Sequence, residues 1–326
     1  IYIDLMLVTS KISPQMMALL LRKVNQCCRG SKQRLLLLFV IIIYAIISLK
    51  WYFITYNKKY EKLSKQLGYI LIDSDKLNQN SYNKTLFVSI TESSTMIFTQ
   101  NLMKSINNAH NYNEYGCTII CLDIKCVKVL TKELNYCNIA KYEGNHDWNK
   151  EEYSQYGSKK FNQFCDERAH ILLNLIDQIE QNSYKTMIFL DNDMYIFDNI
   201  LDDINEKLMN HDIVLQSDDE FCRERYYCAC FISLNLHNPN TINILNDWKD
   251  TIIKETIMGT HKDDQFSWNN MLSKNKYKTI TLDCNLYPNG KTIKNIKNID
   301  KIKIIHANWL KGDVTKQEFL TKYNAW

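Results

Sequence analysis

The sequence predicts an α/β fold in which a mostly parallel, mixed, Rossmann-like sheet is flanked by helices and preceded by one transmembrane helix. Three apolar runs have the composition of buried strands, at residues 85–91, 117–123 and 187–190. Helical stretches alternate with them, at residues 95–108, 125–135 and 161–179. Such alternation favours parallel pairing with right-handed crossovers, and parallel sheets bind ligands at the carboxyl ends of their strands.

The second half of the chain continues this pattern with less regular spacing. Further strands are predicted at residues 211–219, 226–235 and 302–306. Further helices are predicted at residues 201–209, at 240–257, where Trp248 should be buried, and from 261 onward. Residues 141–160 are rich in Tyr, Asn and Gly and are expected to be irregular.

A long apolar run near the amino terminus predicts the membrane segment. Residues 35–49 contain no charged side chain. Lys50 follows and can snorkel to the interface, and the apolar residues 51–54 extend the run. About 20 residues span the hydrocarbon core of a bilayer, and aromatic side chains suit its interface. A cleaved signal peptide is one alternative, but no small-x-small cleavage site follows the run. A helix buried in a protein core is the other.

The charges beside this run set the expected domain order. Residues 1–34 carry six basic side chains against one acid, Asp4, so we expect a cytosolic tail, a signal anchor at 35–54 and a catalytic part in the lumen of the Golgi or ER, or outside the cell. Residues 55–84 are polar and typical of a stem, which leaves 85–326 as the folded domain. The sequon Asn83-Lys-Thr85 matters only if this side is lumenal.

Charge and cysteine content argue against two classes of function. The net charge is +4, and acids and bases are mixed without the basic stripe of a nucleic-acid-binding protein, so we expect no nucleic acid partner. The 11 cysteines include no C-x-x-C pair, which disfavours a structural zinc site. Cys228 and Cys230 are expected to be two small buried side chains on one face of a strand. The cysteines leave the redox compartment open.

The most informative stretch is Asp191-Asn-Asp193, which directly follows the apolar strand at 187–190. Two carboxylates at the carboxyl end of a strand suit Mg²⁺ or Mn²⁺, which prefer hard oxygen ligands. A divalent ion there could neutralise the diphosphate of a nucleotide-linked substrate. The alternative is that the two acids only cap a turn or a following helix.

Other polar residues are expected near the same edge of the sheet. Ser89 and Thr91 lie at the end of the first predicted strand, together with Asp123 of the next. Arg168 lies on the helix at 161–179, where its guanidinium could clamp a phosphate with two hydrogen bonds or could simply be solvated.

Two later segments complete the candidate site. Asp264 and Gln265 open a predicted helix, where they could contact a substrate or serve only as capping residues. His306 ends the last predicted strand, and a loop with Gly312 and Lys316 follows it. His306 is either a third metal ligand, with the loop as a diphosphate clamp, or a structural histidine.

Taken together, these segments resemble a known family. Six features follow one another: the first strand-helix-strand unit, Phe189-Leu-Asp-Asn-Asp193, Gln216-Ser-Asp218, Asp264-Gln265 with Asn269, Leu286-Tyr-Pro-Asn-Gly290, and His306-Ala-Asn-Trp-Leu-Lys-Gly312 with Lys316. Over residues 85–326 they are similar to nucleotide-diphospho-sugar transferases, including plant and slime-mould xylosyl-, arabinosyl- and galactosyltransferases.

The resemblance implies a GT-A fold and transfer of a sugar, with retention of its anomeric configuration, from a nucleotide diphosphate donor such as a UDP-sugar to a glycan or glycoprotein. It implies Mn²⁺ or Mg²⁺ held by Asp191, Asp193 and His306. It also implies that Arg168 and Lys316 lie near the donor phosphates. The full set of residues that we expect to bind the donor is Ser89, Thr91, Arg168, Asp191, Asn308, Gly312 and Lys316.

The chemistry of sugar transfer agrees with this set of residues. Breaking a sugar–phosphate bond places negative charge on the leaving diphosphate, where a metal and basic groups stabilise it. Asp264 and Gln265 are the candidates for steering the oxocarbenium-like centre on the other side of the sugar. The departing phosphate would then deprotonate the acceptor.

The sequence departs from the family pattern at one strand. Where the family usually has Asn-Ala-Gly-Phe, this chain has Cys228-Ala-Cys-Phe231, which removes an amide near the sugar and adds bulk at a glycine position. Two alternatives therefore stay open. One is a haloacid-dehalogenase-type phosphatase with Asp191 as nucleophile and Asp193 as acid, although Tyr195 stands where that signature has Thr or Val. The other is an inactive, membrane-anchored protein that binds sugar nucleotides or glycans.

Overall fold

The computed structural model divides the chain into two compact units, Ile1–Lys65 and Gln66–Trp326. The structure describes residues 31–64, 68–72, 84–111, 113–144, 159–179, 183–222, 226–274 and 276–326. For residues 31–42 and 159–160 it describes the backbone alone.

The first unit contains a single described element, helix α3 (Ser31–Ser64). Among the residues whose side chains are described, no helix is long and apolar enough to cross a membrane. The predicted span at 35–54 begins among residues whose side chains the structure does not describe, so the span stays a prediction. The helix continues to Ser64, well into the segment expected to form a polar stem.

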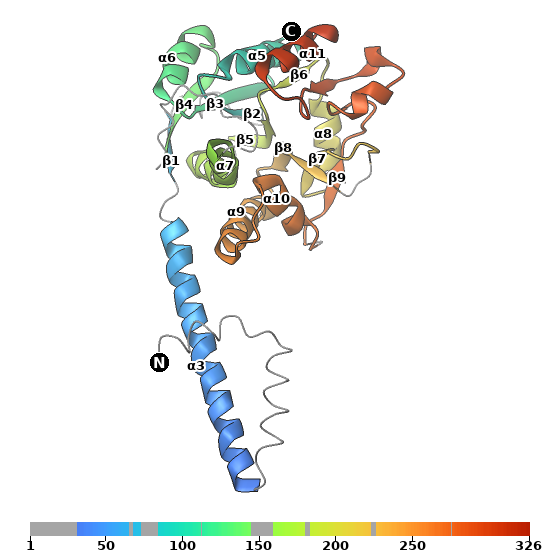
Figure 1. The fold of residues 1–326 in the computed structure, drawn as a ribbon. Coiled ribbons are helices and arrows are strands. Elements are labelled where there is room, and N and C mark those ends of the chain that lie inside the picture. Colours follow the sequence, from blue (N-terminus) through green and yellow to red (C-terminus); the bar gives the residue numbers. More distant parts are fainter. Residues whose placement is uncertain are drawn as a thin grey trace. The chain divides into compact units, whose positions relative to one another are not determined.

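The second unit is built on an eight-stranded mixed sheet in the order β1-β4-β3-β2-β5-β8-β7-β9 (Figure 1). Its strands are β1 (Tyr69–Leu71), β2 (Lys84–Thr91), β3 (Tyr115–Cys121), β4 (Asn138–Glu143), β5 (Tyr184–Leu190), β7 (Ile213–Ser217), β8 (Tyr227–Asn235) and β9 (Thr279–Thr281). The central strands β4, β3, β2 and β5 are parallel, whereas β8 runs antiparallel to both β5 and β7. The predicted mostly parallel mixed sheet is therefore confirmed.

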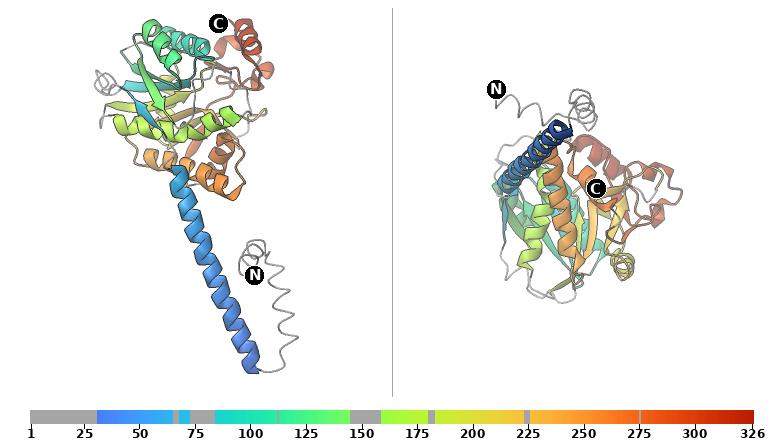
Figure 2. Two further views of the ribbon diagram at one scale, coloured as in Figure 1. Left: turned by 60° about the vertical axis from the view of Figure 1, so that its left-hand side comes forward. Right: turned by 90° about the horizontal axis from the view of Figure 1, so that it is seen from below.

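Helices cover both faces of this sheet. They are α5 (Met96–Ala109), α6 (Ile124–Glu133), α7 (Lys159–Gln178), α8 (Leu201–Leu208), α9 (Asn240–Met258), α10 (Asp264–Leu272) and α11 (Asp313–Lys322), with short 3-10 turns at Thr292–Asn295 and Ile299–Lys301. One apolar core joins the sheet to α7, α9 and α10, and a second joins it to α5, α6 and α8. Helices α7 and α9 lie side by side below the sheet (Figure 2).

The core between sheet and helices contains the predicted Trp248. Its ring packs against Trp268 of α10 with centroids 4.7 Å apart, and its Nε1 donates a hydrogen bond to the carbonyl of Asp264. Both rings are fully buried. This contact fixes the first residue of α10 against α9, which positions Asp264 for the site described below.

Strands β1 and β4 and the short strands β6 and β9 are absent from the predicted elements. β1 lies in the segment expected to be a stem and pairs antiparallel with β4, so the sheet begins earlier than residue 85. β4 overlaps the start of the stretch expected to be irregular. Of the edge strand β1 only Ile70 is buried, β4 buries only two of its six residues, and β6 and β9 have three residues each, so a search for apolar runs misses them.

A separate two-stranded sheet joins β6 (Met194–Ile196) to β10 (Ile304–His306). In this antiparallel pair, His306 lies opposite Met194. The last predicted strand is thus confirmed, and its pairing brings the carboxyl-terminal region to the end of β5.

Candidate active site

The site forms where β5 ends against β8. The backbone N–H of Asp191 donates to the carbonyl of Cys230 at 2.8 Å, which holds the first carboxylate at the end of the β5–β8 ladder. The chain then turns into β6, and the N–H of Ala307 donates to the carbonyl of Asp193 at 3.0 Å. Because β10 pairs with β6, His306 comes to lie beside Asp193, 113 positions earlier in the chain.

Asp191, Asp193 and His306 can offer one ligand atom each within 4.8 Å of one another. His306 Nε2 lies 3.1 Å from Asp193 Oδ1. Asp193 and His306 are buried, whereas the Asp191 side chain is 29% exposed. Two carboxylates and one imidazole form a donor set that suits Mn²⁺ or Mg²⁺, and the partly exposed Asp191 leaves an open side for a ligand. The predicted three residues are brought together and fit a divalent ion.

Gln216 at the end of β7 orients the His306 ring. Its Nε2 donates to the carbonyls of Tyr287 and Pro288 at 3.1 and 3.0 Å, so its Oε1 must face His306 Nδ1, 3.1 Å away. An amide oxygen accepts but cannot donate, so Nδ1 carries the proton. The other ring nitrogen, Nε2, is then directed at the carboxylates.

Lys316 on α11 lies against the same carboxylates. Its Nζ is 2.6 Å from Asp193 Oδ2. Burial alone would raise the pKa of Asp193, but the positive charge of Lys316 and the contact with His306 hold that pKa well below its usual range. Gly312 is the N-cap residue of α11, and its φ of +85° lies in the left-handed region that favours glycine. The structure thus places Lys316 beside the candidate metal ligand Asp193.

Arg168 occupies a different position from the one expected. Its guanidinium is buried and lies 3.4 Å from Asp191 and 3.1 Å from Asp264. It also donates to the carbonyl of Ala229 at 3.0 Å. It is therefore neither a solvated helix residue nor a phosphate clamp at the open edge in this conformation, because its charge is directed at two carboxylates of the site.

Asp264 and Gln265 are not helix caps. Asp263 caps α10 by accepting from the N–H of Phe266, which leaves Asp264 free to face Arg168. Burial raises the pKa of Asp264 to about 7, with Arg168 opposing the shift. Gln265 accepts from the N–H of Ala229 and donates to Asp218 Oδ2 at 2.8 Å.

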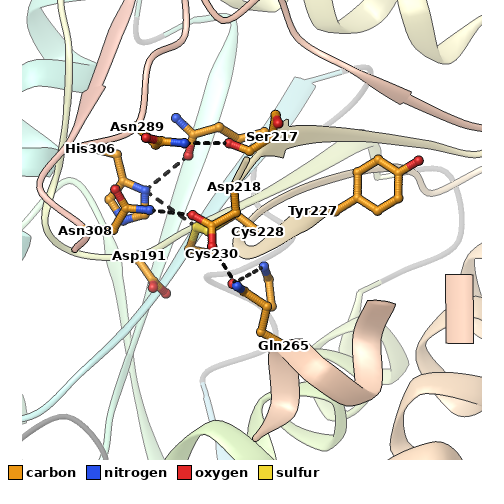
Figure 3. The surroundings of a disulfide bond; sticks show 12 residues. Asp191, Ser217, Asp218, Tyr227, Cys228, Cys230, Gln265, Asn289, His306 and Asn308 are labelled. Carbon is orange, nitrogen blue, oxygen red and sulfur yellow. Dashed lines mark hydrogen bonds between the residues drawn. A yellow bond between two sulfur atoms is a disulfide. The ribbon is translucent and has the colours of Figure 1, made fainter. Parts of the chain in front are cut away.

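Asp218 is a site residue that our sequence assignment missed. Its Oδ1 accepts from Asn308 Nδ2 at 3.0 Å, while its Oδ2 accepts from Gln265 (Figure 3). Its Oδ1 also accepts from Trp309 Nε1 at 3.0 Å. It joins β7, α10 and the loop after β10. Its position as an acid after a predicted strand was the available signal, but such acids are common and the three partners lie 47 to 91 residues away.

The structure places three other predicted donor-binding residues, Thr91, Asn308 and Ser89, in different surroundings. Thr91 lies at the edge, where its Oγ1 accepts a hydrogen bond from Asn192 at 3.3 Å. Asn308 is used structurally, because it links Asp218 to the N–H of Gly290. Ser89 lies two residues before the end of β2 and is fully buried, so its side chain does not reach the edge of the sheet.

The cysteines form more cross-links than the sequence indicated. Cys228 and Cys230 are buried as predicted, but they are joined to each other by a disulfide that lies beside His306 (Figure 3). Three further disulfides link pairs in the described part of the chain, Cys117–Cys137, Cys121–Cys126 and Cys222–Cys284. Cys165 is a buried free cysteine.

Known structures share this fold. The glycosyltransferase GlyE of Streptococcus pneumoniae TIGR4 is similar with a TM-score of 0.50 and 12% identity, over 74% of this chain and 60% of GlyE. An active-site mutant of LgtC is similar with a TM-score of 0.50 and 11% identity, over 73% of this chain and 95% of LgtC. Mouse xyloside xylosyltransferase 1 in its apo form has a TM-score of 0.46 and 13% identity, over 70% and 98% of the two chains. The likenesses to GlyE and LgtC support a GT-A-like fold.

Sequence comparison gives the more specific result. No curated protein matches the chain. The family model for nucleotide-diphospho-sugar transferases matches residues 115–320, which include every residue of the site except Ser89 and Thr91. The match covers the strand that ends in Asp191 and therefore favours sugar transfer over the phosphatase alternative. The chain belongs to the nucleotide-diphospho-sugar transferase family of glycosyltransferases.

Proposed function

We propose that this protein transfers a sugar from a UDP-sugar to a hydroxyl of a glycan or glycoprotein, with retention of configuration and in dependence on Mn²⁺ or Mg²⁺. The observation that carries the proposal is the convergence of Asp193, His306 and Lys316, in which a buried carboxylate holds a histidine on one oxygen and an ammonium on the other. Acidic, imidazole and cationic groups at one point suit a metal–diphosphate complex.

Asp191, Asp193 and His306 would hold the divalent ion. When bound, the ion would neutralise the charge that develops on the leaving diphosphate. Lys316 is already at this point, and its ammonium can exchange the Asp193 oxygen for a phosphate oxygen with little movement. Gln216 keeps the His306 ring in the tautomer that ligation requires.

Asp264 and Gln265 would face the sugar. Gln265 is held from both ends by Ala229 and Asp218, and Asp264 is held by Arg168. We propose that Arg168 fixes the position of Asp191, a proposed metal ligand, relative to Asp264, which is proposed to face the sugar. An ionised Asp264 would stabilise positive charge on the anomeric carbon.

The reaction needs no protein acid at the leaving group. The bond between the anomeric carbon and the phosphate oxygen breaks, and its electron pair stays on the diphosphate. The acceptor oxygen bonds to the same face of that carbon, and its proton passes to the departing phosphate. The products are a glycoside and UDP.

A sugar-nucleotide assay of the full-length chain tests this proposal. We expect hydrolysis or transfer from at least one member of a UDP-sugar panel, only when Mn²⁺ or Mg²⁺ is present. Asp193→Ala should abolish metal-dependent UDP binding, whereas Asp198→Ala, which alters an exposed aspartate five residues later, should not. UDP affinity that is unchanged by both chelation and Asp193→Ala would refute the metal site.

Two other outcomes distinguish the rival functions. Release of phosphate from a simple aryl phosphate, lost in Asp191→Asn, would favour a phosphatase. Tight, metal-dependent UDP binding without turnover on any donor would favour an inactive binding protein.

We further propose that residues 35–54 anchor the chain in a membrane, with the folded unit in the Golgi or ER lumen or outside the cell. The support is the uninterrupted apolar run and the basic residues before it. Carbonate extraction of membranes should leave the chain in the pellet, and its release into the soluble fraction would refute the anchor.

A further inference from the structure

We propose that Cys228 and Cys230 form, with His306, a second cation site that is open only when their disulfide is reduced. This site would bind a soft divalent cation such as Zn²⁺. It would share His306 with the carboxylate pair, so only one of the two cations could use the histidine at a time. Its existence is independent of the proposed sugar transfer; the competition between the two cations rests on the proposed metal site.

The geometry places three suitable ligand atoms together. The two cysteine sulfurs and a ring nitrogen of His306 all lie within 4.8 Å of one another. Cys230 Sγ is 3.5 Å from His306 Nδ1. Ligands of one tetrahedral zinc ion lie roughly 3 to 4 Å apart, given Zn–S bonds of about 2.3 Å and Zn–N bonds of about 2.0 Å. Two thiolates and one imidazole would leave a fourth position for water.

The two nitrogens of His306 face different ligand sets. Nε2 faces Asp193, whereas Nδ1 faces Cys230 and Gln216. A neutral imidazole carries one proton and has one lone pair available for ligation. A cation on Nδ1 therefore replaces the proton that Gln216 accepts and requires a proton on Nε2 instead, which removes the histidine from the carboxylate site. The chemistry of the two sets also differs, because thiolates select soft cations and carboxylates select hard ones.

The disulfide lies in an irregular part of the sheet. Leu215 pairs with Ile232 and Ser217 pairs with Tyr227, so the four residues 228–231 of β8 face Gln216 alone. The Cα atoms of Cys228 and Cys230 are 5.1 Å apart, shorter than the roughly 6.6 Å of residues i and i+2 in an extended strand. This segment is a bulge, and bulges commonly re-aim side chains beside active sites.

The backbone of the same bulge holds the catalytic side of the site. Ala229 accepts from Arg168 and donates to Gln265, and the carbonyl of Cys230 accepts from the N–H of Asp191. Opening the disulfide and binding a cation would therefore act on both the histidine and the residues proposed to face the sugar. The redox state of one cysteine pair is thus coupled to the whole site.

The redox step is an ordinary thiol–disulfide exchange. A small dithiol reductant attacks one sulfur as its thiolate, breaks the Cys228–Cys230 bond and forms a mixed disulfide. Its second thiolate then displaces that sulfur, so the reductant leaves as a cyclic disulfide. The protein gains two electrons and two protons. The two thiols release these protons when they bind the cation as thiolates.

Cadmium titration of the full-length chain tests this site. The chain is reduced with a small dithiol, freed of it without oxygen, and titrated with Cd²⁺, whose thiolate complexes absorb in the ultraviolet. We expect wild type to bind one more equivalent than the Cys228→Ser, Cys230→Ser double variant. His306→Ala should weaken this equivalent by about tenfold or more.

A matched pair elsewhere in the fold controls for the number of thiols. The Cys121→Ser, Cys126→Ser variant removes another closely spaced pair between β3 and α6 and should keep the extra equivalent. Equal Cd²⁺ binding by the wild type and the Cys228/Cys230 double variant would overturn the proposal. A Cys228→Ala, Cys230→Ala variant, with its fold checked by circular dichroism, repeats the comparison in case the serines disturb the core.

The oxidised chain and Mn²⁺ supply the remaining comparisons. In the oxidised chain, with the Cys228–Cys230 bond verified by peptide mass spectrometry, wild type should bind no more Cd²⁺ than the Cys228/Cys230 double variant. An additional bound equivalent of Cd²⁺ would overturn the proposal. In the reduced chain, Mn²⁺ and Cd²⁺ should lower each other's affinity by the same factor. A chain that binds Cd²⁺ at these thiols but shows no metal-dependent sugar transfer would support this site and overturn the proposed function.

Discussion

The ammonium nitrogen of Lys316 lies 2.6 Å from Oδ2 of Asp193, although 123 positions separate the two residues. The ammonium therefore stands beside a carboxylate that is proposed to bind a metal. A divalent metal ion and the Lys316 ammonium repel each other if both lie close to the Asp193 carboxylate. Lys316 is thus suited to leave Asp193 when a diphosphate arrives with its metal.

Lys316→Ala should change metal affinity and catalytic efficiency with the UDP-sugar in opposite directions. We expect Mn²⁺ alone to bind about fivefold more tightly, because the competing positive charge is removed. In contrast, kcat/KM for the UDP-sugar should fall by roughly 100-fold, because a cation that stabilises the leaving diphosphate is lost. Calorimetry with Mn²⁺ and steady-state assays measure the two effects.

Lys303→Ala is the matched control, because Lys303 pairs with Asp203 at 2.8 Å outside the site. It should change neither quantity. Weaker Mn²⁺ binding in Lys316→Ala would contradict the assigned role of this lysine.

Gln216→Leu should weaken the metal site without touching a ligand. The variant removes the acceptor of His306 Nδ1 and so releases the ring tautomer. We expect the Mn²⁺ affinity to fall by about 10- to 100-fold. Gln216→Glu keeps an acceptor toward the ring and should retain more affinity than Gln216→Leu. Equal affinity in the two variants would show that the tautomer does not depend on this side chain.

The raised pKa of Asp264, about 7, predicts the pH dependence of the reaction. Below this pH the carboxyl is mostly neutral, so the form proposed to stabilise positive charge is scarce. In the free enzyme, kcat/KM should therefore rise about tenfold per pH unit until it levels off near pH 7. Asp264→Asn should lower kcat/KM by about 100-fold and remove this rise.

Asp263→Asn serves as the control for this profile. Asparagine also caps helices, so α10 should be retained, and the rise through pH 7 should persist. A profile in Asp264→Asn that still rises with an apparent pKa near 7 would assign the titration to another group.

Arg168→Met should destabilise the fold, because it leaves Asp191 and Asp264 without their shared buried partner. Removing one member of a buried ion pair costs about 3 to 5 kcal/mol in the free energy of unfolding. The loss should be larger at pH 8 than at pH 5. Without Arg168 the folded-state pKa of Asp264 rises further, so the folded state keeps a proton that the unfolded state has lost, and stability falls as pH rises.

Urea denaturation at the two pH values measures the effect of Arg168→Met. Lys276→Met, which breaks an exposed pair with Asp247, should leave the urea midpoint nearly unchanged. An equal loss at pH 5 and pH 8 for Arg168→Met would mean that the two carboxylates are not the groups left unpaired.

The fold could be predicted from the sequence wherever burial leaves a local signal. β2, β3 and β5 are continuous apolar runs because both faces of the central sheet are covered, and all three were predicted. The edge strand β1 exposes two of its three residues and gives no such signal. Its assignment depends on its antiparallel pairing with β4, which is a long-range contact.

The site could be predicted only as far as strand ends reveal it. Asp191 and Asp193 follow an apolar run, so their place at the carboxyl edge of the sheet could be expected from the rule for parallel sheets. His306 ends a strand of the separate antiparallel β6–β10 pair, so that rule does not place it beside Asp193. Ser89 also lies near a strand end, but β2 continues for two more residues and the Ser89 side chain is fully buried. The partners of Arg168 and the hub at Asp218 leave no periodic pattern, because side-chain hydrogen bonds do not repeat along the chain.

By itself, the sequence determined the central strands β2, β3 and β5 with the helices between them, the acids that follow β5 and the family of the chain, since these follow from local apolar patterns and short motifs. Only the tertiary structure decided that Arg168 binds carboxylates, that Asp218 joins three segments, and that Cys228 and Cys230 are bonded beside His306. Those contacts depend on the bulge in β8 and on the β6–β10 pair, which bring residues from distant parts of the chain together. Apolar periodicity reports that a side chain is buried, but it does not specify the side chain it meets.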